Sequence, residues 1–291
     1  MGWLVTGAAG MLGTDVCRVL ARHGESVTAV DRSDLDLFDE DAVADAVAAH
    51  EVVVNCAAWT AVDDAETSED EARAVNAVVP GLLAGAAARH GRRIVHVSTD
   101  YVFDGTARSP YAEDAPTDPA SAYGRTKAAG EAATRAAAPD DHLVVRTAWL
   151  YGANGGCFPR TIARLAREKA ARGESLSVVD DQVGQPTWTV DVAELIVGLV
   201  GADAPAGTWH ATSSGQTTWF EFARRVVECV GLSPDVVSPT DSASMVRPAP
   251  RPAYSVLGHE KLHALGIAPI GAWDERWAAA ASEVLGLEQT Q

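Results

Sequence analysis

The amino-acid sequence predicts an α/β protein, with a doubly wound parallel sheet in its first half and a second, smaller α/β lobe. Two observations support this class. Short apolar segments alternate with longer helical segments as far as residue 150, which is typical of parallel strands joined by crossover helices. Beyond Tyr151 the alternation loosens, and a chain of 291 residues is long enough for one large domain or two lobes.

The elements of the first half follow from their residue patterns. Five segments are short, rich in β-branched residues and almost continuously apolar, as strands covered on both faces are; they are Gly2–Thr6, Ser26–Asp31, Val52–Cys56, Arg93–Ser98 and His142–Arg146. The segments between them are rich in alanine and place apolar residues at helical spacing; they are Met11–Arg22, Asp39–His50, Asp70–His90 and Tyr123–Ala138. Residues 1–150 are therefore predicted to form the first domain.

Residues 151–291 are predicted to form most of the second lobe. Proline and glycine predict turns and a long loop between Pro234 and Pro252. We expect residues 190–212 to return to the first domain, so the second lobe is discontinuous. Its other predicted elements are helices near Phe158–Ala171, Val190–Val200 and Trp219–Val230, and an irregular stretch at Gln182–Thr187.

Composition excludes several classes of partner and site. Asp plus Glu number 40 against 23 Lys plus Arg, and the net charge of −17 repels nucleic acid and anionic lipid. We therefore expect no nucleic-acid partner and no membrane. The four cysteines are widely spaced without a Cys-x-x-Cys pair, which predicts a reducing cytoplasm and neither a disulfide framework nor a cysteine zinc site.

Three glycines, Gly7, Gly10 and Gly13, occupy the turn from the first predicted strand into the first helix. In such a turn the first glycine permits the tight bend, the second lets the backbone approach a pyrophosphate, and the third lets the helix pack closely on the strand. The phosphate then lies on free N–H groups of the helix N-terminus. An ordinary strand-to-helix turn is the alternative, but the flanking elements favour a dinucleotide-binding Rossmann domain over residues 1–150.

Charged residues after the second predicted strand bear on the cofactor. Asp31 lies near the ~20-residue distance from the glycine motif at which a carboxylate binds the ribose 2′-hydroxyl of NAD. Arg32 follows directly, and its guanidinium would instead suit the 2′-phosphate of NADP. Asp36 is a further candidate at the adenosine end, with a turn or helix-cap carboxylate as the alternative. These residues leave the choice between NADPH and NADH open.

Tyr123 and Lys127 lie four residues apart at the start of a predicted helix, so both side chains lie on one helix face. A nearby ammonium is expected to lower the pKa of a phenol from its usual ~10, which suits a proton donor to a carbonyl under reduction. Ser98 and Thr99 follow the fourth predicted strand, where a hydroxyl would meet a substrate in a doubly wound sheet.

Motifs along nearly the whole chain resemble those of the dTDP-4-dehydrorhamnose reductases, within the extended short-chain dehydrogenases/reductases. The segments that carry the resemblance are Thr6–Gly13, Asn55–Asp63, Ser98–Phe103, Tyr123–Lys127, Arg146–Gly152, Asp181–Thr187, Ser214–Trp219 and Arg251–Pro252. One departure is Cys56, where alanine is more usual, and we interpret it as a packing change.

The resemblance implies a catalytic triad of Thr99, Tyr123 and Lys127. Tyr123 would donate the proton to the C4 carbonyl oxygen, Lys127 would bind ribose hydroxyls, and Thr99 would hydrogen-bond the developing oxyanion. Trp149 and Trp59 are equally open to a role as core aromatics. The implied cofactor contacts are Gly7, Gly10, Met11, Leu12, Gly13, Asp31, Arg32, Asp36, Leu37, Cys56, Ala57, Ala58, Tyr123 and Lys127. The implied substrate contacts are Thr60, Val62, Thr99, Tyr123, Trp149 and Arg251, with Arg251 facing the nucleotide diphosphate.

The implied activity is the NAD(P)H-dependent reduction of the C4 ketone of a dTDP-linked 4-keto-6-deoxysugar, above all dTDP-4-dehydro-L-rhamnose, or a related deoxysugar. Two other functions stay open. A nucleotide-sugar epimerase or dehydratase would retain its NAD, but the Asp-Glu pair expected after Thr99 in a dehydratase is Asp100-Tyr101 here. The second is a regulatory subunit that binds the cofactor without catalysing a reaction, although the intact Tyr123 and Lys127 argue against it. The oligomeric state is open, a homodimer included.

Two patterns that resemble metal sites are given a structural interpretation. His259–His263 spells His-Glu-x-x-His, a zinc-helix motif, but the segment is short and a clear third ligand does not follow it. The acidic residues from Asp63 to Glu71 are expected to be solvated charges around a helix start. His96 alternates within an apolar strand and is expected to be a core residue. We predict no metal site.

Overall fold

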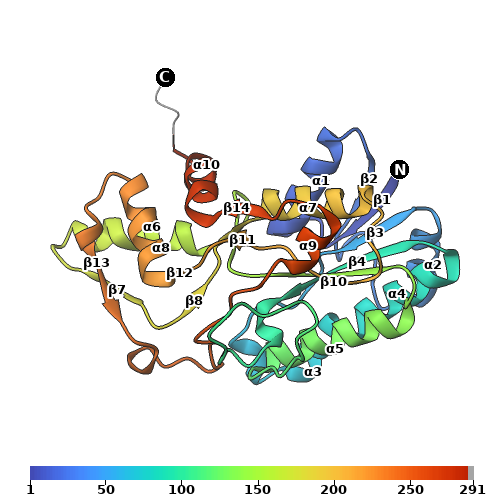
Figure 1. Ribbon diagram of the computed structural model, residues 1–291, viewed down its shortest axis with the longest axis horizontal. Helices are drawn as coiled ribbons and strands as arrows, with labels where there is room; N and C mark the ends of the chain where they lie inside the picture. The colour runs from blue at the N-terminus through green and yellow to red at the C-terminus, as the bar shows by residue number, and fades with distance from the viewer. Residues whose placement is uncertain (288–291) are drawn as a thin grey trace.

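A computed structural model describes residues 1–287 of the chain (Figure 1). Its largest sheet has six parallel strands in the order β10-β5-β4-β3-β1-β2. Its strands are β1 Gly2–Thr6, β2 Ser26–Val30, β3 Val52–Asn55, β4 Arg93–Thr99, β5 His142–Thr147 and β10 Gly207–His210. The strand order reverses between β1 and β3, and such sheets bind ligands beyond the carboxyl ends of the strands at that point. The predicted α/β class and doubly wound parallel sheet are confirmed.

Helices cover both faces of this sheet (Figure 1). On one face α1 (Met11–Arg22) packs against α7 (Thr189–Gly201), and on the other α2 (Glu40–Ala48) and α5 (Ala122–Ala137) pack against α4 (Val79–His90). Successive strand residues point to opposite faces. Val5 therefore lies in the core beneath α1 and α7, whereas its neighbour Leu4 lies in the core beneath α4. Both α7 and β10, from the second half of the sequence, belong to this first core.

The helix predicted over Asp70–His90 is interrupted. It consists of α3 (Glu69–Arg73), a π-helical turn over Ala74–Val78 and α4. Pro80 has no N–H to bond the carbonyl of Asn76, which favours a departure from regular α-helix here. The side-chain amide of Asn76 bonds the N–H and the carbonyl of Trp59 and the hydroxyl of Thr126, at 2.8–3.1 Å. The π turn thus fixes the helix that follows β3 against α5.

The second lobe has its own core, in which α6 (Phe158–Ala170), α8 (Trp219–Cys229) and α10 (Trp273–Leu285) surround Phe222. Beside it β7 (Leu176–Val179) pairs in parallel with β13 (Val237–Thr240). The smaller elements are β6 Leu150–Tyr151, β8 Val183–Gly184, β9 Thr187–Trp188, β11 Ser213–Ser214, β12 Thr217–Thr218, α9 Glu260–Leu265 and β14 Ile270–Ala272. Residues 288–291 of the predicted lobe lie outside the described residues.

Two predictions for this lobe are wrong. Gln182–Thr187 is not wholly irregular, because it contains β8 and the start of β9, which are too short to show a two-residue periodicity. The turns and long loop predicted between Pro234 and Pro252 are interrupted by β13, a strand that the prediction did not include. Proline signals a loop, but Pro239 is tolerated since β13 lies in a two-stranded sheet with a free edge.

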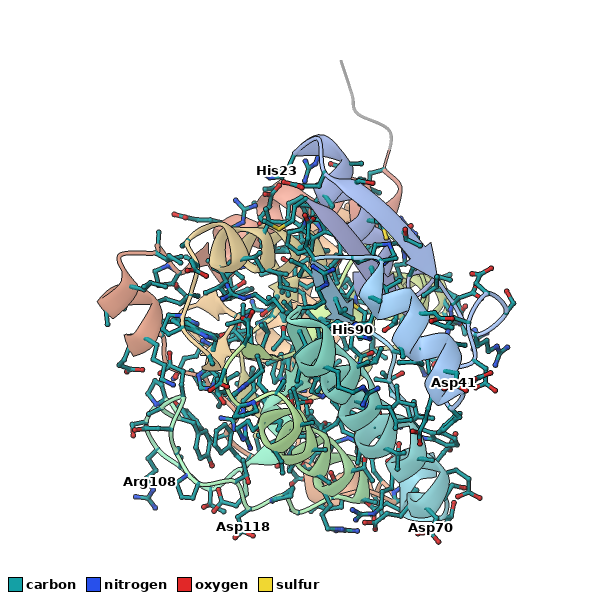
Figure 2. All side chains as sticks on the ribbon, turned by 90° about the vertical axis from the view of Figure 1, so that its right-hand side faces the viewer. His23, Asp41, Asp70, His90, Arg108 and Asp118 are labelled. Carbon is teal, nitrogen blue, oxygen red and sulfur yellow. The ribbon has the colours of Figure 1, made fainter. Side chains whose placement is uncertain are left out.

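Acidic residues lie on several different parts of the surface. Asp41, Asp70 and Asp118 are exposed and point outward from different elements at the periphery (Figure 2). Among residues 1–287 no helix combines the length and the hydropathy that crossing a membrane requires. The four cysteines are free thiols.

Candidate active site

The turn between β1 and α1 is shaped by glycines at close approaches of the backbone. Gly7 has a φ of +67°, and a Cβ there would lie 2.6 Å from the amide nitrogen of Ala57. A Cβ on Gly13 would lie 2.2 Å from the carbonyl oxygen of Gly7. Gly10 precedes α1 and provides no side-chain cap, so the first-turn N–H groups of the helix stay available to an anion. The turn therefore fits the pyrophosphate of a dinucleotide.

A cavity of about 660 Å³ extends from this turn past the end of β2. Oxygen Oδ1 of Asp31 accepts hydrogen bonds from the Ser33 hydroxyl and backbone N–H, both at 2.7 Å, and these bonds lower the Asp31 pKa. Asp36 accepts from the Phe38 N–H at 3.0 Å and so stabilises a turn. Arg32 forms no ion pair with any other residue of the described chain. Members of the predicted cofactor set that line this cavity are Gly7, Gly10, Asp31, Arg32, Asp36, Leu37, Cys56, Ala57 and Ala58.

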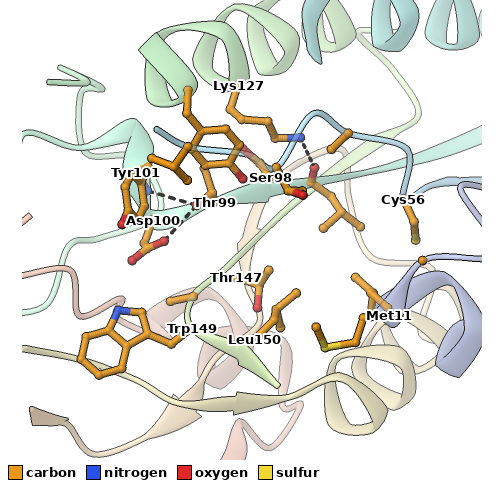
Figure 3. A pocket seen from close by; sticks show the side chains of 18 of the residues that line it. Met11, Cys56, Ser98, Thr99, Asp100, Tyr101, Lys127, Thr147, Trp149 and Leu150 are labelled. Carbon is orange, nitrogen blue, oxygen red and sulfur yellow. Dashed lines mark hydrogen bonds between the residues drawn. The ribbon is translucent and has the colours of Figure 1, made fainter. Parts of the chain in front are cut away.

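A second cavity, of about 600 Å³, lies beyond the carboxyl ends of β4 and β5 (Figure 3). Gly10, Cys56 and Ala58 line both cavities, so the two form one groove. Burial raises the pKa of the Cys56 thiol to about 12, which makes this residue a neutral part of the wall. The other predicted residues that the structure brings together here are Met11, Leu12, Gly13, Thr60, Val62, Thr99, Tyr123, Lys127 and Trp149.

Tyr123 and Lys127 lie one turn apart on α5, and both line the second cavity. Lys127 is buried beside the end of β4 (Figure 3), and Tyr123 is half-buried. The ammonium of Lys127 donates to the carbonyl oxygen of Val97 at 2.7 Å. Burial lowers the pKa of Lys127 to about 8, while the carboxylate of Glu131, one further turn along the helix, acts to raise it. The ammonium is therefore charged at neutral pH.

The expectation that Lys127 lowers the pKa of Tyr123 is wrong. Burial raises the pKa of Tyr123 to about 12, the Thr99 side chain acts to lower it, and the charge of Asp100 acts to raise it. The ammonium is bonded to the Val97 carbonyl and does not offset the effect of burial. The phenol is consequently protonated at neutral pH, which is the state that a proton donor requires.

Thr99 closes β4 and bonds to the residues that follow it. Its hydroxyl donates to Oδ1 of Asp100 at 2.9 Å and accepts from the N–H of Tyr101 at 3.2 Å (Figure 3). Burial raises the pKa of Asp100 to about 6. Tyr101 packs edge-on against Tyr123 with ring centroids 5.6 Å apart. Asp100 and Tyr101 line the cavity but were missed as site residues, although they directly follow Thr99 in one of the motifs.

Trp149 forms part of the cavity wall. Its indole stacks on Trp219, with centroids 3.6 Å apart and planes 6° from parallel. Its backbone has a φ of +48°, and a Cβ on Gly184 would lie 2.3 Å from the indole. Trp219 was missed because it belongs to α8, far along the sequence. Trp59 lines the first cavity and donates from Nε1 to the carbonyl of Ala61 at 3.1 Å.

A third cavity, of about 360 Å³, shares Tyr101 and Trp219 with the second and extends into the second lobe. Arg251, the remaining predicted substrate contact, lines this third cavity rather than the second. Its Nη2 lies 2.9 Å from Oδ1 of Asp63. The interpretation of Asp63 as a solvated charge is therefore wrong, because this half-buried carboxylate pairs with an arginine of the second lobe.

The first histidine of the zinc-like motif and the buried His96 bond to other side chains. His259 precedes α9, and its Nε2 lies 2.9 Å from the Thr212 hydroxyl. His96 is buried in β4, and its Nδ1 lies 3.2 Å from the Asn55 amide. Over residues 1–287, no three His, Cys, Asp or Glu side chains are placed to hold a metal ion.

Comparison with known proteins assigns this geometry to a family. The family model described as RmlD substrate binding domain matches residues 1–285. The probable dTDP-4,6-dihydroxy-2-methyloxan-3-one 4-ketoreductase of Streptomyces antibioticus is 49% identical over 99% of this chain and 97% of its own. The dTDP-4-dehydrorhamnose reductase of Streptomyces griseus is 48% identical over 93% of this chain and 90% of its own. A dTDP-4-dehydrorhamnose reductase from Bacillus anthracis in complex with NADP superposes with a TM-score of 0.90, at 32% identity over 96% of this chain and 98% of that structure. The chain belongs to the RmlD family of dTDP-4-dehydrorhamnose reductases.

Proposed function

We propose that this protein reduces the C4 ketone of a dTDP-4-dehydro-6-deoxyhexose, with NADPH as the hydride donor. The observation that carries the proposal is the position of Tyr123, a half-buried and protonated phenol in the middle one of three adjoining cavities. The glycine turn lies toward one end, and Arg251 lines the cavity at the other. The relatives named above, at 48–49% identity, are reductases of dTDP-linked ketosugars.

The groove from Asp31 to Lys127 would hold the dinucleotide. The glycine turn and the uncapped start of α1 would bind its pyrophosphate, and Lys127 would bind ribose hydroxyls. Bound NADPH supplies the hydride that reduces the ketone. Arg32 supports a preference for NADPH, since its guanidinium lines the adenosine end, while Asp31 leaves NADH as the second choice.

The catalytic roles of this chain would be proton transfer and charge stabilisation. Tyr123 holds its proton at neutral pH and would give it to the carbonyl oxygen as negative charge develops there. The charged Lys127 would hold the ribose of the cofactor beside the phenol. Thr99 would hydrogen-bond the same oxygen, after its hydroxyl turns away from Asp100.

The second and third cavities would divide the substrate between them. Thr60, Val62 and Trp149 line the second cavity with Tyr123 and would contact the sugar. The nucleotide would extend into the third cavity, where Arg251 would contact the diphosphate. dTDP-4-dehydro-L-rhamnose is the proposed sugar, giving dTDP-L-rhamnose, with a related deoxysugar as the alternative.

The test is oxidation of NADPH by purified protein and enzymatically made dTDP-ketosugar, followed by NMR of the product. We expect Tyr123→Phe to reduce kcat by ~10²–10⁴-fold with NADPH binding unchanged. Tyr254→Phe is the matched control, because that hydroxyl bonds Gln216 at an exposed site away from all three cavities.

Other outcomes would replace the proposal. Failure to oxidise NADPH with any dTDP-ketosugar would refute reduction. Copurified NAD together with turnover but no net NADPH consumption would instead support an epimerase or dehydratase. A Tyr123→Phe variant with unchanged biological function would support a regulatory subunit.

A further inference from the structure

Residues 246–251 include two arginines that line the third cavity, and a single side chain provides the polar contacts of this segment with the rest of the protein. The N–H of Ala249 donates to Oδ1 of Asp63 at 3.2 Å, and Nη2 of Arg251 lies 2.9 Å from the same oxygen. Nη1 of Arg247 lies 3.9 Å from Oδ2. Within the described chain, no other hydrogen bond or ion pair joins this segment to another part of the molecule.

The two flanks of this segment are fixed independently of Asp63. On one side, the N–H of Ser242 donates to Asp181 at 2.8 Å. On the other side, the N–H of Tyr254 donates to the carbonyl of Gly105 at 3.0 Å. Loss of the Asp63 contacts would therefore release residues 246–251 locally, while the elements around them stay in place.

Asp63 links residues of the second cavity with residues of the third. Its neighbour Val62 lines the second cavity with Tyr123, whereas Arg247 and Arg251 line the third. Asp63 belongs to the first lobe, since it directly precedes the short helical turn after β3, and the two arginines belong to the segment beyond β13. A ligand with its sugar in one cavity and its nucleoside in the other would pass its linking group beside these three residues.

The charges of this cluster suit an anionic linking group. One carboxylate faces two guanidinium groups, so a positive charge is left over. Arg251 uses Nη2 for Asp63 and Nη1 for the Ala249 carbonyl, at 3.0 Å, and an arginine has further N–H donors in the same plane. A guanidinium whose orientation is already fixed loses less rotamer freedom when it binds phosphate oxygens.

We propose that Asp63 is a positioning residue, which holds Arg247, Arg251 and the segment 246–251 in the arrangement that binds the diphosphate of the nucleotide sugar. The proposal rests on the dTDP-linked substrate of the proposed function. Counting charges alone would predict that neutralising Asp63 strengthens dTDP binding, and the proposal predicts the opposite. Neutralising Asp63 makes the site more positive, yet dTDP binding becomes weaker because the arginines lose their fixed positions.

The experiment compares dTDP with thymidine, which lacks the diphosphate, by calorimetry on wild-type protein and Asp63→Asn. We expect the variant to bind dTDP ~10-fold more weakly and thymidine within about twofold of wild type. The KM for the ketosugar rises by a similar factor while kcat changes less than about twofold, because Asp63 touches no reacting atom. The control is Asp191→Asn, which breaks the paired contact of Asp191 with Arg276 between α7 and α10, outside all three cavities, and leaves dTDP binding unchanged.

A double-mutant cycle tests whether Asp63 acts through its partner. In an Arg251→Gln background, Asp63→Asn should weaken dTDP binding less than it does in wild type, because only Arg247 and the Ala249 contact are left for it to position. Fully additive effects would overturn the proposal. Unchanged or tighter dTDP binding by Asp63→Asn, or an equal loss for thymidine, would also overturn it. Should Asp63→Asn fold poorly, Arg247→Ala provides the test, since that side chain is 56% exposed. We expect it to weaken dTDP and not thymidine, and unchanged dTDP binding would overturn the proposal.

The binding measurements do not depend on turnover. Wild-type protein that binds dTDP but reduces no ketosugar refutes the proposed function and leaves the role of Asp63 measurable. Wild-type protein that binds no dTDP refutes the role of Asp63 directly, whatever reaction the protein catalyses.

Discussion

Replacement of Lys127 by methionine is expected to make the protein more stable at neutral pH while it removes a proposed catalytic group. Lys127 is 2% exposed, and burial lowers its pKa from 10.5 to about 8. At ~1.4 kcal/mol per pKa unit, keeping this ammonium charged in the folded protein costs about 3 kcal/mol. Its bond to the Val97 carbonyl offsets ~0.5–1.5 kcal/mol. Methionine is unbranched and adaptable, so Lys127→Met should raise the free energy of unfolding by ~2 kcal/mol at pH 7.

The sign of the pH dependence follows from the lowered pKa. Below about pH 8 the lysine is charged in both the folded and the unfolded chain, and the folded protein carries the whole cost. Between about pH 8 and 10.5 the unfolded chain binds a proton that the folded chain has released. The free energy of unfolding of the wild-type protein therefore rises relative to that of the variant as pH increases. The stability advantage of Lys127→Met should therefore shrink through this window.

Urea unfolding of wild type and Lys127→Met in steps from pH 7 to above pH 10 measures the difference. Lys169→Met is the control, because that ammonium is 37% exposed on α6 and its replacement leaves the buried site unchanged. A Lys127→Met variant that is less stable than wild type at pH 7, or a difference that stays constant with pH, would refute the reasoning. If Lys127→Met is more stable than wild type but has lost turnover, the wild-type protein is less stable because it keeps a buried charge for its chemistry.

Three further predictions concern the second core, the buried ion pair and the cofactor. Phe222 is fully buried between the helices of the second lobe, and Phe222→Ala should lower the free energy of unfolding by ~3–5 kcal/mol in urea titrations; a loss below ~1 kcal/mol would contradict this packing. Glu131→Gln leaves the guanidinium of Arg146 buried without a counter-charge and should cost ~3–5 kcal/mol, whereas an unchanged unfolding curve would show that Arg146 finds another partner. Arg32→Ala should raise the KM for NADPH by ~10-fold and leave that for NADH unchanged; an equal effect on both would exclude a contact with the 2′-phosphate.

The parts of the site with local signals could be predicted from the sequence. The glycine turn is contained in a few residues, and α1 begins and ends at the predicted residues. The spacing of Tyr123 and Lys127 places them on one face of α5 because helical geometry fixes the relation. Trp149 and Arg251 were predicted as site residues only from the resemblance to a known family, because no local sequence pattern indicates that they lie there.

The parts that were missed depend on contacts between distant segments. Trp219 reaches the site only because α8 packs beside Trp149, and the pairing of Asp63 with Arg251 joins the two lobes. No spacing rule predicts such contacts. The pKa of Tyr123 was predicted in the wrong direction for a related reason, since sequence gives the distance along the helix but not the burial that dominates the shift.

One face of α5 links the proposed chemistry to the stability of the sheet. Tyr123, Lys127 and Glu131 follow one another at single-turn intervals, and both oxygens of Glu131 accept from Arg146 of β5 at 2.8 Å. Burial acts to raise the pKa of Glu131, but the hydrogen bonds and charge of Arg146 outweigh it and the pKa is lowered. The carboxylate therefore stays charged and acts to raise the pKa of Lys127, against the effect of burial. A buried ion pair is weak evidence for stability by itself. Here it has a separate consequence, because it supports the positive charge with which Lys127 would bind the ribose hydroxyls of the cofactor beside Tyr123.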